Sequence, residues 1–205
     1  MKPRMLVLLI FVIGLLLFLY QKRQRLEFDQ QRQTISMAGY QFSSQPQQSE
    51  IPRPSFSFKG YTVRPLADFL IRARVLSREN YSVDAGSKLS PMDLALGWQR
   101  MADPAIYGAL HITQGSRWYR YSLHGQPPIP PQEIVESSAN MHLIPADESV
   151  ANVLDQAEPG RFVRIKGKLV EVTGEKGWLW RSSLSRTDSG AGSCELIFVE
   201  AAVVE

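Results

Sequence analysis

The sequence has one cysteine in 205 residues, Cys194, so an intramolecular disulfide is impossible and no covalent framework can support the fold. It has only three histidines, and none has a second histidine or a cysteine at the spacing of a zinc-ligand pair. These histidines are His111, His124 and His142. We therefore expect neither a metal site nor a cofactor.

The globular part of the chain lacks net charge. The formal net charge of the whole chain is +3, and residues 1–52 carry all of it, with six Lys and Arg against three acids. Residues 53–205 hold seventeen residues of each sign. Because neutralisation of phosphates dominates affinity for nucleic acids, a neutral domain makes nucleic acid an unfavoured partner.

Only one long apolar run is present, and it lies at the start of the chain. Met5 to Tyr20 contains no charged residue, and Lys or Arg flanks it at positions 2, 4, 22, 23 and 25. A helix of this length rises about 24 Å, less than a hydrocarbon core of about 30 Å, but snorkelling basic side chains and the interfacial Tyr20 close the gap. The sequence predicts a tail over residues 1–4 and a transmembrane helix over residues 5–20, so the membrane is an expected partner.

A cleaved signal peptide is the alternative to a membrane anchor. Its first plausible cleavage pattern, Ser36-Met37-Ala38, lies too far beyond the apolar run, which favours an uncleaved signal-anchor. The flanking charges alone favour a cytoplasmic domain, but long downstream domains translocate largely regardless of them. We expect a single-pass protein of the bacterial inner membrane with its domain in the periplasm.

Residues 21–54 are rich in glutamine and close with Ile51-Pro52-Arg53-Pro54. The stretch from Ser43 to Ser49 has almost no apolar side chain, so burial cannot offset the entropy of ordering it. We predict a Gln/Pro-rich stalk over residues 21–54 that tethers one globular domain over residues 55–205. About 150 residues suffice for one hydrophobic core and are too few for two comfortable domains.

The domain shows mainly strand periodicity. Apolar and polar residues alternate over 56–58 and 61–64 around a kink at Gly60, and again over 69–75. A hairpin is predicted with arms 111–114 and 117–122 on either side of Gly115-Ser116. Helical segments are predicted from the Ser90 cap to about Met101, after Asp103-Pro104 towards Leu110, and from the Asp147 cap to Pro159-Gly160.

The strongest fold signal lies near the C-terminus. An alternating strand over 162–172 is interrupted by Gly167, and partner strands follow over 178–182 and 194–199. Small Greek-key barrels such as the OB-fold bend their first strand in this way. The sequence predicts a mostly β domain (α+β) with two or three short helices, forming an OB-like or similar small barrel after one transmembrane helix. A mixed α+β sandwich is the alternative.

One set of residues could carry hydrolase chemistry. His142 could act as a base for Cys194, or for a serine of the Ser137-Ser138 pair, with Asp188 as the orienting acid. No nucleophile-elbow glycine pattern and no Cys-His signature accompanies them. A loop whose polar groups satisfy the backbone is the blander interpretation, and Cys194, in phase with two apolar strand residues, fits a buried position.

A second set could bind a ligand. Aromatic and basic residues gather in the last third of the chain, a combination by which barrels stack bases or sugars. The candidates are Trp178, Trp180, Arg181 and Arg186, with Trp118 from the predicted hairpin. The glycine-rich stretch after Arg186 is either an anion-binding loop or a plain hairpin loop. An OB-type nucleic-acid binder is thus a second alternative function.

Three strings add a resemblance: residues 93–98, residues 138–146, and residues 181–188 with Cys194-Glu195. They are similar to a group of bacterial hypothetical proteins that carry an N-terminal membrane anchor. The resemblance covers most of the domain from about Phe56 and implies a bacterial, membrane-tethered domain, without assigning a role to any residue. With no catalytic signature, the sequence favours a non-catalytic binding or assembly module of the bacterial envelope with a protein partner at the membrane.

Overall fold

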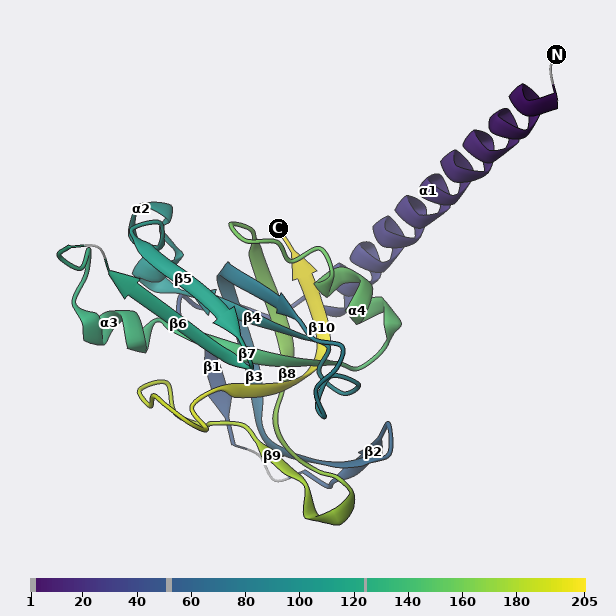
Figure 1. Ribbon diagram of the computed structural model, residues 1–205. Coiled ribbons are helices and arrows are strands. Elements are labelled where there is room, and N and C mark those ends of the chain that lie inside the picture. The colour runs from purple at the N-terminus through teal and green to yellow at the C-terminus, as the bar shows by residue number, and fades with distance from the viewer. Residues whose placement is uncertain (1–2, 51–52, 124) are drawn as a thin grey trace.

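The computed structural model describes residues 3–50, 53–123 and 125–205, and it is mostly β, as predicted (Figure 1). Met1 and Lys2 of the predicted tail, Ile51 and Pro52 of the predicted stalk, and His124 lie outside the described residues. The α-helices are α1 (Pro3–Ser36), α2 (Pro104–Tyr107), α3 (Pro131–Glu136) and α4 (Glu148–Leu154). The strands are β1 (Gln47–Ser49), β2 (Phe56–Phe58), β3 (Tyr61–Asn80), β4 (Met92–Gly97), β5 (Leu110–Gly115), β6 (Trp118–Leu123), β7 (Ser138–Pro145), β8 (Phe162–Thr173), β9 (Leu179–Arg181) and β10 (Glu195–Val204).

Eight of these strands form one sheet, and the hairpin β5–β6 forms a second sheet of two strands. The pairing path runs β1-β3-β4-β7-β10-β8-β9, β2 joins β3, and β3 pairs with β8 as well as with β4. The long strand β3 can do this because its residues 62–74 pair with β8 and its residues 74–80 pair with β4. Register shifts at Pro65/Ala67 and Val75/Ser77 bend the strand between these partners. The pair β7–β10 is parallel.

Successive side chains of these strands point to opposite faces of the sheet, and each face has its own core cluster. Leu94, Met141 and Ile197 have no exposed surface and belong to the main core cluster. Ile144 and Leu196, which have the opposite phase, pack in a second cluster with aromatic residues of β2 and β9. Polar residues that share this second phase therefore lie outside the main core.

Gly167 permits the close approach of β8 and β10. An ideal Cβ at this position would lie 2.2 Å from the backbone oxygen of Phe198 and 3.1 Å from Cα of Val199. We predicted that the glycine interrupts its strand, but β8 runs without a break from Phe162 to Thr173. The glycine is required by the neighbouring strand, which carries a register shift between Val199 and Ala201.

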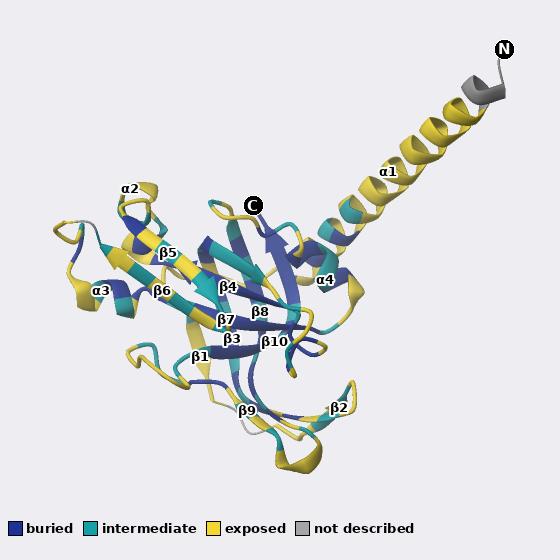
Figure 2. Ribbon diagram, in the orientation of Figure 1, coloured by how far each residue is buried: buried dark blue, intermediate teal, exposed yellow. Residues whose placement is uncertain are grey.

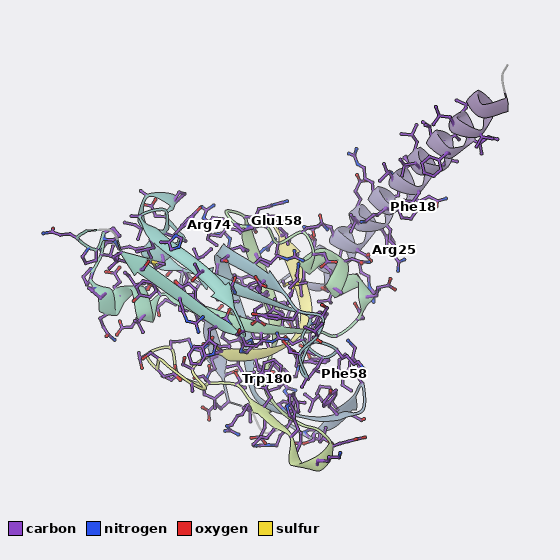
Figure 3. The ribbon with its side chains drawn as sticks, in the orientation of Figure 1. Phe18, Arg25, Phe58, Arg74, Glu158 and Trp180 are labelled. Atoms are coloured by element: carbon purple, nitrogen blue, oxygen red, sulfur yellow. The ribbon has the colours of Figure 1, made fainter. Side chains whose placement is uncertain are left out.

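Helix α1 is continuous, and its first part stands free of the domain (Figures 1 and 2). By length and composition it is the one helix among the described residues that could cross a membrane, a property that anchors and signal sequences share. Figure 3 labels Phe18 on the free part and Arg25 where the helix reaches α4. The apolar N-terminal helix that we predicted is confirmed at this level.

The segment predicted as the first part of a stalk has a defined structure. Helix α1 continues to Ser36, and its residues 29 and 33, together with Met37 just after its end, are buried against α4 and β10. Asn152 donates to Asp29 (2.8 Å), Gln33 donates to Ser149 (3.0 Å), and Gln30 donates to the carbonyl of Val204 (2.8 Å). Later in the predicted stalk, β1 pairs with β3. The domain is thus docked directly on the helix.

The helix predicted from Ser90 to Met101 is wrong over most of its length. Residues Met92–Gly97 form strand β4, which pairs with β3 and β7, and only the turn Gln99–Ala102 is helical, as a 3-10 turn. Every residue of β4 is buried, so this strand lacks the alternation that would have distinguished it from a helix. Ser90, Pro91 and Asp93 have the order that is typical of a helix start, and this pattern led to the wrong prediction.

Other local predictions are confirmed. Asp147 caps α4 by accepting a hydrogen bond from the backbone N–H of Val150, and Asp103 caps α2 in the same way. The predicted hairpin exists as β5–β6, with its turn one residue later than expected, at Ser116-Arg117. Both residues have positive φ, 51° and 65°, as a two-residue hairpin turn of this type requires.

Candidate functional site

A groove lies between the β5–β6 hairpin, β7 and the loop that leads into β10. It consists of two adjoining hollows of about 400 and 330 Å³, which share Trp118, Gly190 and Cys194 in their linings. The first is also lined by Tyr119, Arg120, Tyr121, Val135, Ser138, Ala139, Asn140, Asp188, Ser189 and Ser193. The second is also lined by Arg117, His142, Leu179, Trp180, Arg181, Ala191 and Gly192. These two hollows together are called the groove below.

The floor of the groove includes residues 138–140 and His142 of β7, and strand β4 pairs with β7 beside them. Asp93 lies opposite His142 and Ala95 lies opposite Asn140 in the antiparallel register. Because the side-chain period of a strand is two, these residues point away from the core that Leu94 and Met141 enter. Asp93, Asn140 and His142 are all buried, so the hairpin covers a polar surface that must be satisfied internally.

Arg117, in the hairpin turn, satisfies much of this surface. Its guanidinium donates to Asp93 Oδ1 (2.7 Å), to both oxygens of Asp84 (2.9 and 3.0 Å) and to the carbonyl of Ser90 (2.9 Å). It also stacks over the ring of Tyr81, 3.7 Å from its centroid. The hydrogen bonds from Arg117 hold the pKa of Asp84 below its ordinary value. Arg117 thus fastens the hairpin to β4 and to the loop 81–91.

His142 lies beside the same acid. Its Nδ1 lies 2.9 Å from Asp93 Oδ1, without the alignment of a hydrogen bond, and its ring packs 4.8 Å from that of Trp180. The predicted orienter, Asp188, instead accepts a hydrogen bond from the Ser183 hydroxyl at 2.6 Å. Among the described residues, the acid beside His142 is therefore Asp93 and not Asp188.

The predicted nucleophiles are engaged elsewhere. The hydroxyls of Ser137 and Ser138 donate to the carbonyls of Glu133 and Ile134, at the end of α3. Cys194 lines the groove with His142, but its sulfur contacts the amide of Asn140 (3.8 Å) and the carbonyl of Arg117 (3.9 Å). Burial raises the pKa of the Cys194 thiol to about 11, so it is protonated at neutral pH.

We expect Cys194 to react slowly with iodoacetamide in the folded protein. Its thiol pKa is raised from 9.0 to about 11, so the thiolate fraction at pH 8 is about a hundredfold lower than in the unfolded chain. The rate should rise about tenfold per pH unit until the pH approaches that pKa. Mass spectrometry of time points, with the chain in urea as the control, measures both rates. Equal rates in the two states would contradict the buried thiol.

The ligand candidates divide into two groups. Trp118, Trp180 and Arg181 line the groove, and Figure 3 labels Trp180. Trp178 packs edge-to-face on Trp180 and against Tyr61, behind the groove. The Arg181 side chain donates to Glu171 (2.6 Å) and so brings no unpaired charge.

Arg186 is not among the residues that line the groove, and its guanidinium lies against a buried acid. Its Nη1 lies 2.6 Å from Oε1 of Glu195, whose side chain is 1% exposed. Burial raises the pKa of Glu195 to about 8, against the opposing attraction of Arg186. Glu195 shares the strand phase of Ile197 and therefore points towards the main core. Arg186 stabilises this buried acid, a structural role.

The sequence did not identify Arg117, Asp84 or Asn140 as site residues, and Asp93 was assigned to a helix start. One signal was available: Asp93 interrupts the apolar run 92–98, where a buried acid demands a partner. Nothing local identifies Arg117 as that partner, because 23 residues separate the two. Among the described residues no group of three or more His, Cys, Asp or Glu could hold a metal ion.

Comparisons of this chain with protein-family models, with curated proteins and with solved structures find no match.

Proposed function

We propose that this chain is a non-catalytic binding module, held at the bacterial inner membrane by α1, which takes up an extended segment of a protein partner in its groove. The observation that carries the proposal is the free edge of β6 beside an aromatic groove. Within the part of the chain that the structure describes, strand β6 pairs only with β5, and its residues 118–121 line the first hollow opposite residues 138–140 of β7. An extended peptide can add to such an edge through main-chain hydrogen bonds while its alternate side chains enter pockets.

The charges of the groove favour a peptide over a nucleic acid. Arg117 is paired with Asp84 and Asp93, and Arg181 is paired with Glu171. The remaining charged residues of the lining, Arg120 and Asp188, have opposite signs. The groove therefore offers aromatic rings and hydrogen-bonding groups, with little net positive charge for a phosphate backbone. The hydrolase alternative has weaker support, since its serines and its thiol are engaged or protonated.

The scaffold that we propose is a small barrel of OB type. Counted as strands one to five, β3, β4, β7, β8 and β10 pair in the order 1-2-3-5-4-1, and α4 lies between strands three and four. This order supports a Greek-key barrel. OB barrels bind ligands on the face of strands two and three, between the loops one-two and four-five. The groove lies over β7, which is strand three, and beside the loop 182–194 in the connection from strand four to strand five.

The location follows from the helix and its flanks. Helix α1 buries none of its apolar residues 7–20 against the domain, and their side chains are 42–70% exposed, which fits a lipid-embedded segment better than a helix in water. The Lys and Arg residues on both sides fit headgroup contacts at the two membrane surfaces. A domain docked at residues 25–37 would stand close to the membrane, on its periplasmic side.

Photo-crosslinking from the groove tests the proposal. Benzoyl-phenylalanine replaces Trp118, which is 38% exposed in the groove, and in a matched strain replaces Tyr40, an aromatic residue of 43% exposure outside it. We expect crosslinks to a discrete envelope protein from position 118 and not from position 40. The crosslinked segment, made as a synthetic peptide, should bind the purified full-length chain. Proline at successive positions of this peptide should abolish binding at every second residue, where a main-chain donor is lost.

Four results would contradict the proposal. Equal crosslinking from both positions would remove the groove as the binding surface. A peptide that tolerates proline throughout would exclude strand addition, and a nucleic acid as the crosslinked species would favour the OB-type nucleic-acid binder. A crosslinked partner that resides in the cytoplasm would reverse the proposed orientation.

A further inference from the structure

One face of α1 beyond the apolar segment is left uncovered. Phe28 and Ile35 are 65% and 68% exposed, although they are among the few apolar residues of this polar part of the helix. The buried positions 29, 33 and 37 face α4 and β10. At about 100° per residue, Phe28 and Ile35 lie on the opposite side of the helix from these positions. The chain's own domain therefore cannot cover them.

The uncovered face is part of a stripe that runs the length of the helix. Its residues are spaced alternately by three and four, the heptad spacing of a coiled-coil seam. Between residues 21 and 36 all charged residues lie off the stripe. The stripe consists of Val7, Ile10, Gly14, Leu17, Gln21, Gln24, Phe28, Gln31 and Ile35.

Lipid does not explain the lower part of this stripe. Phe28 is eight residues beyond Tyr20, which places it about 12 Å further along the helix axis than the end of the apolar segment. At that distance the hydrocarbon core has ended if residues 5–20 span it. An exposed phenylalanine and isoleucine in heptad register therefore fit a second helix better than water.

We propose that a second copy of this chain covers the stripe, so that two α1 helices form a parallel pair through and beyond the membrane. This inference rests on the membrane anchoring that we propose above. Two copies inserted in the same direction present their stripes to each other in register. Each domain docks on the face of α1 opposite the stripe, so both domains fit outside the pair.

Charge and side-chain size support a pairing of like chains. Glu27 lies just before the stripe residue Phe28, and Arg32 lies just after Gln31, which makes them g and e positions. In a parallel pair, residue g of one helix faces residue e of the next heptad on the other, so Glu27 meets Arg32 of the second copy. Both are exposed. Glu27 accepts a hydrogen bond from Arg23 of its own helix at 2.9 Å, an exposed pair of the kind that contributes little, and the contact of Arg32 with Asp147 in its own chain is long, at 3.7 Å. In the membrane, Gly14 has nothing within 4 Å of its Cβ position and allows close helix contact.

Disulfide crosslinking in native membranes tests the pair. The Cys194→Ser change removes the native thiol, so each test variant carries one introduced cysteine. Gln31→Cys places this thiol on the stripe, and Ser36→Cys places it on another exposed face at the end of the helix. Facing stripe positions bring two Cα atoms within the roughly 7 Å that a disulfide allows, so oxidation should yield about tenfold more covalent dimer from Gln31→Cys. Equal yields, or a product that contains a different protein, would overturn the inference.

A charge on the stripe gives an independent measurement. Phe28→Glu in the full-length chain should convert a dimer into a monomer in lipid nanodiscs, by mass photometry, whereas Ser36→Glu should remain dimeric. A dimer unaffected by Phe28→Glu would also overturn the inference. Carbonate extraction and photo-crosslinking from position 118 separate this result from the proposed function. Release of the wild-type chain by carbonate would refute the anchor, whereas retention with a monomeric wild-type chain would refute only the pair.

Discussion

Replacing Arg117 with alanine is expected to lower the free energy of unfolding by about 3–5 kcal/mol, because it leaves the carboxylate of Asp93 buried without a cation. Asp93 is 0% exposed, and the Arg117 side chain is 17% exposed, so solvent screens this interaction little. Alanine also inherits the positive φ of 65° at the turn without the contacts that offset its strain. Thermal unfolding of the full-length chain should show a midpoint lowered by about 10 °C.

Arg120→Ala is the matched control, since Arg120 lies on the same hairpin and is exposed. We expect its free energy of unfolding to stay within about 0.5 kcal/mol of wild type. A double-mutant cycle with Asp93→Asn should show strong coupling, because removing the acid as well relieves the buried charge. Equal unfolding temperatures for Arg117→Ala and Arg120→Ala would contradict the role of Arg117.

The difference in the free energy of unfolding between wild type and Arg117→Ala should become smaller as the pH falls below about 4. Arg117 holds the pKa of Asp84 below its ordinary value of 3.8. A carboxyl with a lowered folded-state pKa stabilises the fold above its unfolded pKa and loses this contribution as pH falls through the folded value. The stabilisation that Arg117 gives through Asp84 is therefore complete above about pH 4 and declines below it.

Sequence reasoning succeeded where a few neighbouring residues determine the structure. The caps of α2 and α4 and the existence of the hairpin β5–β6, whose turn was predicted one residue too early, depend on local hydrogen bonds and backbone preferences, which the sequence displays directly. The strand β8 was found from its alternation, because one of its faces is more exposed than the other.

Sequence reasoning failed where every residue of a strand is buried, and where a helix packs on the domain through polar side chains. Strand β4 is buried on both faces and so has no alternation to read. Helix α1 docks through Asp29, Gln30 and Gln33, whose hydrogen bonds reach residues more than a hundred positions away. Their polar composition is typical of a solvated stalk, because the neighbouring sequence does not indicate the distant residues with which they form hydrogen bonds.

The candidate site shows the same division. Trp118 and Trp180 were identified by composition, and they do line the groove. Arg117 fastens the hairpin by its hydrogen bond to the buried Asp93, and the two residues meet only through the pairing of distant elements. A long-range ion pair of this kind can be recognised in the sequence by one local feature at most, which here is an acid within an apolar run.

Replacing Gly167 with alanine is expected to cost more than about 4 kcal/mol, the range of exceptional destabilisation. The added Cβ would lie 2.2 Å from the backbone oxygen of Phe198, and backbone cannot move aside as a flexible side chain can. Gly167 is paired on both sides, with Phe69 of β3 and Val199 of β10, so β8 cannot shift without breaking two ladders. Soluble yield and thermal unfolding of the full-length chain measure the effect.

Gly115→Ala is the control, because it makes the same substitution in strand β5 where nothing lies within 4 Å of the new Cβ. It should be neutral, or stabilise the fold by up to about 1 kcal/mol through the unfolded state. If Gly167→Ala were as soluble and as stable as Gly115→Ala, β8 and β10 could not approach as closely as described. The register shift between Val199 and Ala201 turns the Phe198 carbonyl onto β8, so one residue without a side chain accommodates the bulge of its neighbour.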